Sequence, residues 1–144
     1  MGGDEVKYLL DTSAWLRGYL EPGTVPRAEQ SVMTSPGEIF GLSGISLWEV
    51  GKKHQQGKLP LPSGLAAWFR LALGNNVEIL PLTPEIIVDA MNLPGFSNRD
   101  PADELITATA RVHNLTLLTT DKRLKGYRHA RIHYFKPVME RKKK

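Results

Sequence analysis

The chain has 144 residues, a length that fits one domain with a sizeable core. Its 41% hydrophobic and 24% charged residues are ordinary for a globular protein, and the lack of cysteine excludes disulfides, thiolate zinc sites and thiol nucleophiles. The net charge of +4 invites a nucleic-acid partner, but the last four residues are all basic, and without them 15 basic residues face 15 acidic ones.

The predicted elements alternate between short apolar strands and amphipathic helices. Strands are expected at 6–10, 38–42, 77–80, 115–118 and 132–135. Helices are expected at 12–20, 26–33, 46–56, 63–73, 84–92 and from 101 to about 112, with a short one beginning near 121. This alternation predicts an α/β fold of three layers, in which helices cover both faces of a parallel sheet. We assign 1–135 to this domain and 136–144 to a basic tail.

The chain carries no recognisable export or membrane signal. Its first residues, MGGDEVKYLL, do not resemble a signal peptide. No apolar run approaches the roughly 20 residues that a membrane-spanning helix needs. Together with the absence of cysteine, this leads us to expect a cytoplasmic protein with no membrane partner.

Four acidic residues each stand where an apolar stretch gives way to the start of a predicted helix. They are Asp11, Glu49, Asp103 and Asp121, in the strings YLLDTSAWL, GISLWEVGKK, NRDPADELITATA and LTLLTTDKRL. Each could instead serve its own helix: Asp11 and Asp121 as N-caps, and Glu49 in a capping box with Ser46. Asp103 would lie in the first turn of a helix that Asp100 caps.

One explanation accounts for all four acids together, whereas capping accounts for each acid only by itself. Parallel strands end at the same edge of a sheet, so Asp11, Asp103 and Asp121 are expected together there, with Glu49 within reach. Gathered carboxylates repel one another unless they are protonated or a hard cation lies between them. Oxygen ligands favour Mg²⁺, with Mn²⁺ as a second option, and such an ion activates water for phosphodiester hydrolysis without a histidine base. The pattern therefore predicts a metal-dependent hydrolase.

Small hydroxyl residues stand beside two of these acids. They are Thr12, Ser13, Thr119 and Thr120. As neighbours of metal ligands they are expected to hold a carboxylate or a water by hydrogen bonds. As ordinary helix-start residues they would have no such role, and the sequence leaves both interpretations open.

These acidic strings, in this order, resemble the PIN-domain family, and within it the VapC-type toxins of prokaryotic toxin–antitoxin pairs. The KLPLP and EILPLTPE segments also look like one VapC subfamily, and the resemblance covers about residues 6 to 135. It implies a Mg²⁺-dependent endoribonuclease that cuts structured RNA such as tRNA or rRNA. It also implies a homodimer and a VapB-like antitoxin that covers the site.

The resemblance assigns unequal roles to the acids. Asp11 and Asp103 would be the principal metal ligands, while Glu49 and Asp121 would complete the acidic site, with Asp121 holding a second metal or a water. Asp100 is an additional candidate that either joins the site or only caps its helix. Two other functions remain: a DNA or flap-type nuclease with the same site, and a catalytically silent RNA- or protein-binding PIN module. The complete set of acids argues against a catalytically silent module.

Other candidate residues are interpreted without a catalytic role. The histidines, His54, His113, His129 and His133, lack metal-ligand spacing and are expected in surface or packing positions. The tryptophans Trp15, Trp48 and Trp68 are expected in core or dimer packing rather than in base stacking. Basic residues that either contact RNA phosphates or form a solvated face are Arg17, Lys52, Lys53, Lys58, Arg99 and Arg123.

Overall fold

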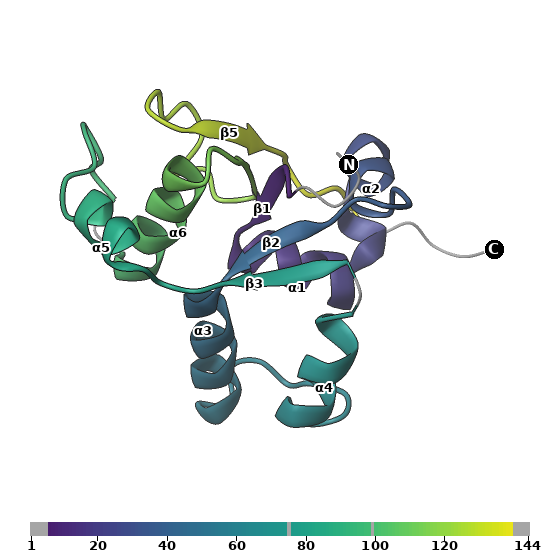
Figure 1. Cartoon of the computed structure of the whole chain (residues 1–144). Helices are drawn as coiled ribbons and strands as arrows, with labels where there is room; N and C mark the ends of the chain where they lie inside the picture. Colours follow the sequence, from purple (N-terminus) through teal and green to yellow (C-terminus); the bar gives the residue numbers. More distant parts are fainter. Residues whose placement is uncertain (1–5, 75, 99, 140–144) are drawn as a thin grey trace.

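A parallel β-sheet forms the centre of the computed structural model, which describes residues 6–74, 76–98 and 100–139 (Figure 1). Within these ranges the strands are β1 (Tyr8–Leu10), β2 (Phe40–Ser43), β3 (Val77–Leu80), β4 (Thr116–Thr119) and β5 (Arg131–Tyr134). The α-helices are α1 (Thr12–Leu20), α2 (Arg27–Met33), α3 (Gly44–Gln55), α4 (Leu65–Ala72), α5 (Pro84–Ala90) and α6 (Pro101–Val112), and a 3₁₀ turn, η2, spans Pro22–Thr24. Neighbouring strands run in the order β3-β2-β1-β4-β5, each pair parallel, which confirms the predicted fold class.

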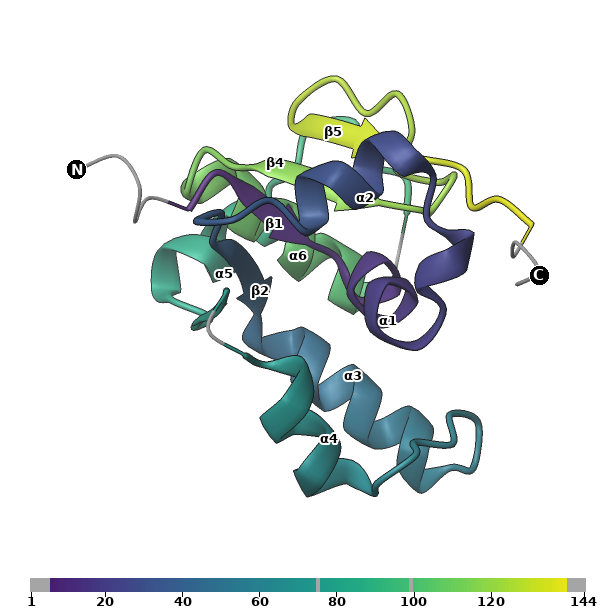
Figure 2. The same ribbon diagram turned by 90° about the vertical axis from the view of Figure 1, so that its right-hand side faces the viewer.

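Successive side chains of a strand point to opposite faces of the sheet, and in the central strands the side chains on both faces are buried. Leu10 lies in register with Leu42 and Leu118, and these three belong to the core cluster that includes α1 and α4. Leu9 lies in register with Leu117, and both pack with α6 on the other face. Figure 2 shows the same division, with α1 and α2 in front of the sheet and α6 behind it. Such continuous apolar runs are typical of parallel strands covered on both sides.

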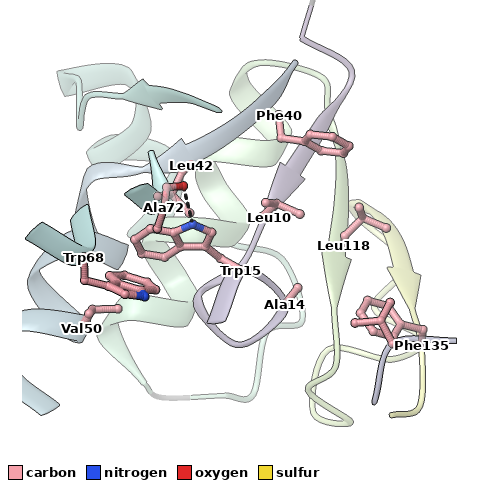
Figure 3. Packing of buried hydrophobic residues seen from close by; sticks show 11 residues of the cluster. Leu10, Ala14, Trp15, Phe40, Leu42, Val50, Trp68, Ala72, Leu118 and Phe135 are labelled. Atoms are coloured by element: carbon pink, nitrogen blue, oxygen red, sulfur yellow. Dashed lines mark hydrogen bonds between the residues drawn. The ribbon is translucent and has the colours of Figure 1, made fainter. Parts of the chain in front are cut away.

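Trp15 fixes α1 to the first of these cores. Its side chain is 0% exposed, and its indole N–H donates to the carbonyl oxygen of Ala72, with 3.4 Å between the heavy atoms. The rings of Trp15 and Trp68 pack with centroids 4.9 Å apart, and Val50 of α3 belongs to the same cluster (Figure 3). This packing holds the start of α1 in a defined position at the end of β1.

Two local predictions are wrong, and a third is narrowed. Helix α3 begins at Gly44, directly after β2, with Ser43 as its N-cap, so Ser46 lies inside the helix and its capping box with Glu49 does not form. Residues 122–126 form turns instead of a short helix, because the Asp121 carboxylate accepts the Arg123 backbone N–H two residues on, which closes a turn. Trp48 is 60% exposed, so it is not part of the core that contains Trp15 and Trp68, and of its two predicted placements, core or dimer packing, only dimer packing stays a prediction.

The boundary regions add two observations. Of the predicted basic tail, 136–144, residues 140–144 lie outside the described residues. The segment before them returns to the domain, where the Val138 backbone N–H donates to the Thr24 carbonyl at 2.8 Å. In the part of the chain that the structure describes, no helix has the length and apolarity to cross a membrane.

The strand order defines where a site should form. From β1 the chain proceeds to β2 on one side, whereas from β4 it proceeds to β5 on the other. Connections that diverge in this way open a crevice beyond the carboxyl ends of the two strands. The fold therefore places its crevice after Leu10 and Thr119, where Asp11 and Asp121 follow.

Replacement of Trp15 by alanine should destabilise the protein by about 3–5 kcal/mol, because it opens a large cavity between α1, α4 and the sheet. The Trp48→Ala variant makes the same chemical change at an exposed position and should alter stability by less than about 0.5 kcal/mol. Urea unfolding followed by circular dichroism measures both. Equal losses in the two variants would contradict the assignment of Trp15 to the core.

Candidate functional site

The crevice at the ends of β1 and β4 is an acidic pocket with a volume of about 270 Å³. All five sequence-predicted acids line it: Asp11, Glu49, Asp100, Asp103 and Asp121. Its other lining residues are Thr12, Ser13, Lys53, Thr120 and Arg123. Acids from distant parts of the chain are therefore brought to one place by the parallel sheet and by the start of α6.

Asp11 is the most buried of these acids, at 4% exposure. Its backbone N–H still belongs to the sheet and donates to the Leu118 carbonyl at 3.1 Å. Its side chain caps α1 by accepting the Ala14 backbone N–H at 2.8 Å, which confirms the capping prediction. Both carboxylate oxygens are engaged, since Ser13 Oγ donates to Oδ1 at 2.9 Å and Thr119 Oγ1 donates to Oδ2. Asp11 is therefore both a cap and a wall of the pocket.

Hydroxyl groups connect the acids that line the pocket. Thr12 Oγ1 donates to Glu49 Oε1, which ties α1 to α3. Ser13 Oγ and Thr120 Oγ1 lie 2.8 Å apart, which ties α1 to the end of β4. Thr119 Oγ1 accepts the Asp121 backbone N–H at 2.9 Å and donates to Asp11. Each hydroxyl thus orients an acid or joins two walls of the pocket.

The start of α6 supplies the opposite wall. Asp100 caps this helix by accepting the Ala102 backbone N–H at 3.0 Å, and Asp103 follows in the first turn. Asn98 fixes both acids: its Nδ2 donates to Asp103 Oδ2 at 2.6 Å, and its Oδ1 accepts the Asp100 backbone N–H at 3.0 Å. Asn98 was not among the residues predicted from the sequence, although its position two residues before a helix cap is typical of such a turn.

Arg123, which lines the pocket together with Lys53, forms ion pairs with two of its acids. Its Nη2 lies 3.0 Å from Asp103 Oδ2 and 2.9 Å from Asp121 Oδ2, so one guanidinium joins the two acids. Its side chain is 58% exposed, so this pairing adds little to stability. The sequence analysis named Arg123 only as one of six basic residues, because an ion pair between turn residues and a distant helix leaves no local pattern.

The acids are poorly compensated despite these contacts. Burial raises the pKa of Asp11 to about 6, although hydrogen bonds from Thr119, the Ala14 amide and Ser13 lower it. Burial also raises the pKa of Asp103 to about 6, and the neighbouring charges of Asp100 and Asp121 add to the rise. Asp121 differs: burial raises its pKa, but the hydrogen bonds and charge of Arg123 outweigh burial and leave the pKa below its usual value.

This chemistry fits a hard divalent cation. The donors are carboxylate and hydroxyl oxygens, and two buried carboxyls with raised pKa values would release protons to a cation that binds them. Among the described residues, however, no three acidic or histidine side chains already converge into a cage. The bond from Thr12 holds Glu49, and Arg123 holds Asp103 and Asp121, so these side chains would have to rearrange to share an ion.

Most other candidate residues lie away from the pocket. Arg17 Nη1 lies 3.5 Å from Glu21 Oε1, and Arg17 does not line the pocket, whereas Lys53 does. His133 Nε2 lies 2.8 Å from Glu29 Oε2, and His54 Nδ1 lies 2.9 Å from the Leu59 carbonyl oxygen, both as packing contacts. Arg99 lies outside the described residues.

Comparisons with known proteins agree in sequence and in fold. The family model described as PIN domain matches residues 8–130. Ribonuclease VapC22 of Mycobacterium tuberculosis (strain ATCC 25618 / H37Rv) is 31% identical over 123 residues, which make up 85% of this chain and 93% of that protein.

The fold is also similar to solved structures of much lower identity. VapBC2 from Rickettsia felis, bound to a DNA fragment from their promoter, matches with a TM-score of 0.68 and 16% identity, over 90% of this chain and 98% of that chain. DNA-bound VapBC from Salmonella typhimurium matches with a TM-score of 0.68 and 17% identity, over the same shares of the two chains. A toxin–antitoxin complex from Klebsiella pneumoniae matches with a TM-score of 0.63 and 19% identity, over 90% and 99%. At these identities the likeness shows the fold alone.

The stability of the metal-free protein should fall between pH 4 and pH 7. Because the pKa of Asp11 is raised, the stabilisation from its neutral carboxyl is fully present below pH 3.8 and is lost as the pH rises through about 6. In EDTA, the unfolding free energy of Asp11→Asn should fall by about 2–3 kcal/mol less over this range than that of the wild type. One pKa unit corresponds to about 1.4 kcal/mol. Urea unfolding at several pH values measures the difference. Glu85→Gln, at an exposed acid on α5, should follow the wild type, and an equally steep Asp11→Asn profile would contradict the raised pKa.

Proposed function

The chain belongs to the PIN-domain family, in its VapC-type branch, and on this premise we propose that it is a Mg²⁺-dependent endoribonuclease, the toxin of a toxin–antitoxin pair. The observation that carries the proposal is the acidic pocket, which five acidic residues line and in which two carboxyls have pKa values raised to about 6. A ribonuclease relative that is 31% identical supports RNA as the substrate class. Structured RNA such as tRNA or rRNA is the substrate that we propose.

The roles of the acids follow from their positions. We assign Asp11, Asp103 and Asp121 to hold the metal ion, with Glu49 as a further acid of the reaction. A divalent ion bound there supplies Lewis-acid chemistry, by lowering the pKa of a water and stabilising charge on phosphoryl oxygens. Mn²⁺ has the same ligand preference and should replace Mg²⁺. Asp100 faces the same pocket while it caps α6, so it serves as a supporting acid that keeps the negative potential high.

The chain's own hydroxyl groups position these acids. Thr119 holds Asp11 and receives the Asp121 amide, while Thr12 holds Glu49. Ser13 and Thr120 close the side of the pocket between α1 and β4. These hydrogen bonds orient Asp11 and Glu49 toward the pocket before the substrate phosphate approaches.

We also propose an antitoxin partner, a homodimer and a cytoplasmic location. The antitoxin is supported by the solved VapBC complexes whose fold this chain shares. Exposed apolar side chains that a second copy could bury include Trp48 of α3 at 60%, Val88 of α5 at 62% and Met91, the residue after α5, at 66% exposure.

Purified protein should cleave tRNA or rRNA in Mg²⁺ or Mn²⁺ and lose this activity in EDTA. Since loss of an outer partner of a metal ligand already lowers activity by about 10–100-fold, Asp11→Asn and Asp103→Asn should lower it by at least about 100-fold. The control Glu85→Gln should stay active. Gel assays with tRNA, rRNA, single-stranded DNA and a flap DNA measure all of these. RNA cleavage that persists in EDTA would sink the metal mechanism, preference for DNA would favour a DNA nuclease, and binding without any cleavage would favour a silent module.

The Thr119→Val variant should lower the RNA cleavage rate by about 10–100-fold at neutral pH, because it removes the hydroxyl that holds Asp11. The hydrogen bond from Thr119 lowers the pKa of Asp11, so its loss should raise that pKa and let protons compete with Mg²⁺ more strongly. Activity should therefore recover partly at higher pH or higher Mg²⁺, and Thr119→Ser should stay near the wild type. A uniform loss at every pH and Mg²⁺ concentration would show a general structural defect instead.

A further inference from the structure

The acidic pocket continues into two basic hollows through shared lining residues. Arg123 lines both the pocket and a hollow of about 330 Å³ between residues 95–98 and 123–129. Arg128 and His129 line that hollow and also a third one, of about 460 Å³, which extends to Arg131. We call this continuous surface the basic trough and define it by Arg123, Lys125, Arg128, His129 and Arg131. It runs from the acids, along the turns after β4, to the start of β5.

The charge of the trough is not compensated within the described part of the chain. The two outer hollows have a single acidic lining residue, Asp89, and Arg111 already binds it through two hydrogen bonds of 2.8 and 3.2 Å. Lys125, Arg128 and Arg131 are exposed, and among the described residues none of them forms an ion pair. Three cations thus line a groove that leads away from a cluster of carboxylates.

The backbone that carries these cations is held in place. Arg111 Nη1 donates to the His129 carbonyl oxygen, and Tyr127 Oη donates to the Pro94 carbonyl oxygen at 2.7 Å. The Tyr127 ring packs edge-on against Phe96 and against His129, with centroid distances of 5.2 and 5.7 Å. A positively charged groove on a fixed loop loses little entropy when it meets an extended polyanion.

We propose that the basic trough holds the single-stranded RNA backbone that flanks the cleaved phosphate, an inference that rests on the proposed ribonuclease function. Phosphates on either side of the reacting one would be repelled by the carboxylates of the pocket and attracted by Lys125, Arg128 and Arg131. Electrostatic contacts with phosphates supply much of nucleic-acid affinity and make it salt-dependent. The trough therefore acts on substrate affinity and on the path of the strand, whereas the acids act on the bond that breaks.

The test compares two triple variants of equal charge change. Lys125→Gln/Arg128→Gln/Arg131→Gln removes the uncompensated cations of the trough. Lys7→Gln/Arg27→Gln/Arg70→Gln removes one lysine and two arginines that are also exposed but line none of the three hollows. Circular dichroism checks that both variants fold, and binding of a fluorescein-labelled 20-nucleotide oligouridine is measured by anisotropy in EDTA at several KCl concentrations.

The trough variant should bind the 20-mer at least about 10-fold more weakly than the wild type. Its slope of log Kd against log salt should fall by about 2, because each phosphate of a single strand that the protein neutralises adds about 0.7 to this slope. The control variant should change affinity by less than about 2-fold. With a cleavable RNA, the trough variant should show a raised KM and a retained kcat, and a four-nucleotide RNA should be affected much less than a long one.

Each contrary result of this experiment identifies which of the two proposals is wrong. If the wild type cleaves RNA and the two variants bind the 20-mer equally well, the trough proposal is wrong while the proposed function stands. If the wild type cleaves no RNA but binds the 20-mer through the trough, the nuclease proposal fails alone. If a 20-residue polyglutamate binds as tightly as the RNA with the same dependence on the three cations, the trough is a docking surface for acidic protein and the RNA path is overturned.

Discussion

Burial of the Asp11 carboxylate at the junction of β1 and β4 is the constraint on which the site depends. A carboxylate at 4% exposure needs full compensation, and hydrogen bonds from the Ala14 amide, Ser13 and Thr119 still leave its pKa at about 6. At neutral pH the ionised carboxylate makes the metal-free domain less stable than the neutral carboxyl would. Keeping an acid in this position is the kind of local instability that marks functional sites.

The fold places the buried Asp11 beside other acids, next to a surface of opposite charge. Carboxylates converge on the acidic pocket, whereas the surface that leads away from it over the turns after β4 is positive. Arg123 stands at the boundary, paired with Asp103 and Asp121 on one side and lining the basic trough on the other. A polyanion therefore meets attraction along its length and repulsion at one phosphate only, where a bound cation would reverse the sign. Under the proposed function, substrate alignment and metal dependence would have the same electrostatic origin.

The sequence predicted the parts of this arrangement that depend on local patterns. Apolar runs followed by an acid located β1 and Asp11, and the alternation of strands and helices implied that the strand ends would meet. Contacts across the chain were beyond reach: the tie between Asn98 and Asp103, and the pairing of Arg123 with two acids, join segments whose separation no periodicity encodes. The predicted Ser46–Glu49 capping box does not form. Helix α3 begins before Ser46, and Thr12 of another helix holds Glu49 instead. Local rules thus predicted that these acids would lie at one pocket, but not the side chains that hold them.

Helix capping, which the structure shows at Asp11 and Asp100, is compatible with the proposed metal binding at the same pocket. The N-termini of α1 and α6 both open onto the acidic pocket, where Asp11 and Asp100 accept backbone N–H groups. A helix N-terminus carries a partial positive charge, so each helix offsets part of the repulsion among the carboxylates. This offset lets the acids gather before any cation arrives. Because it is incomplete, as the raised pKa values of Asp11 and Asp103 indicate, the pocket retains a driving force for binding a divalent ion.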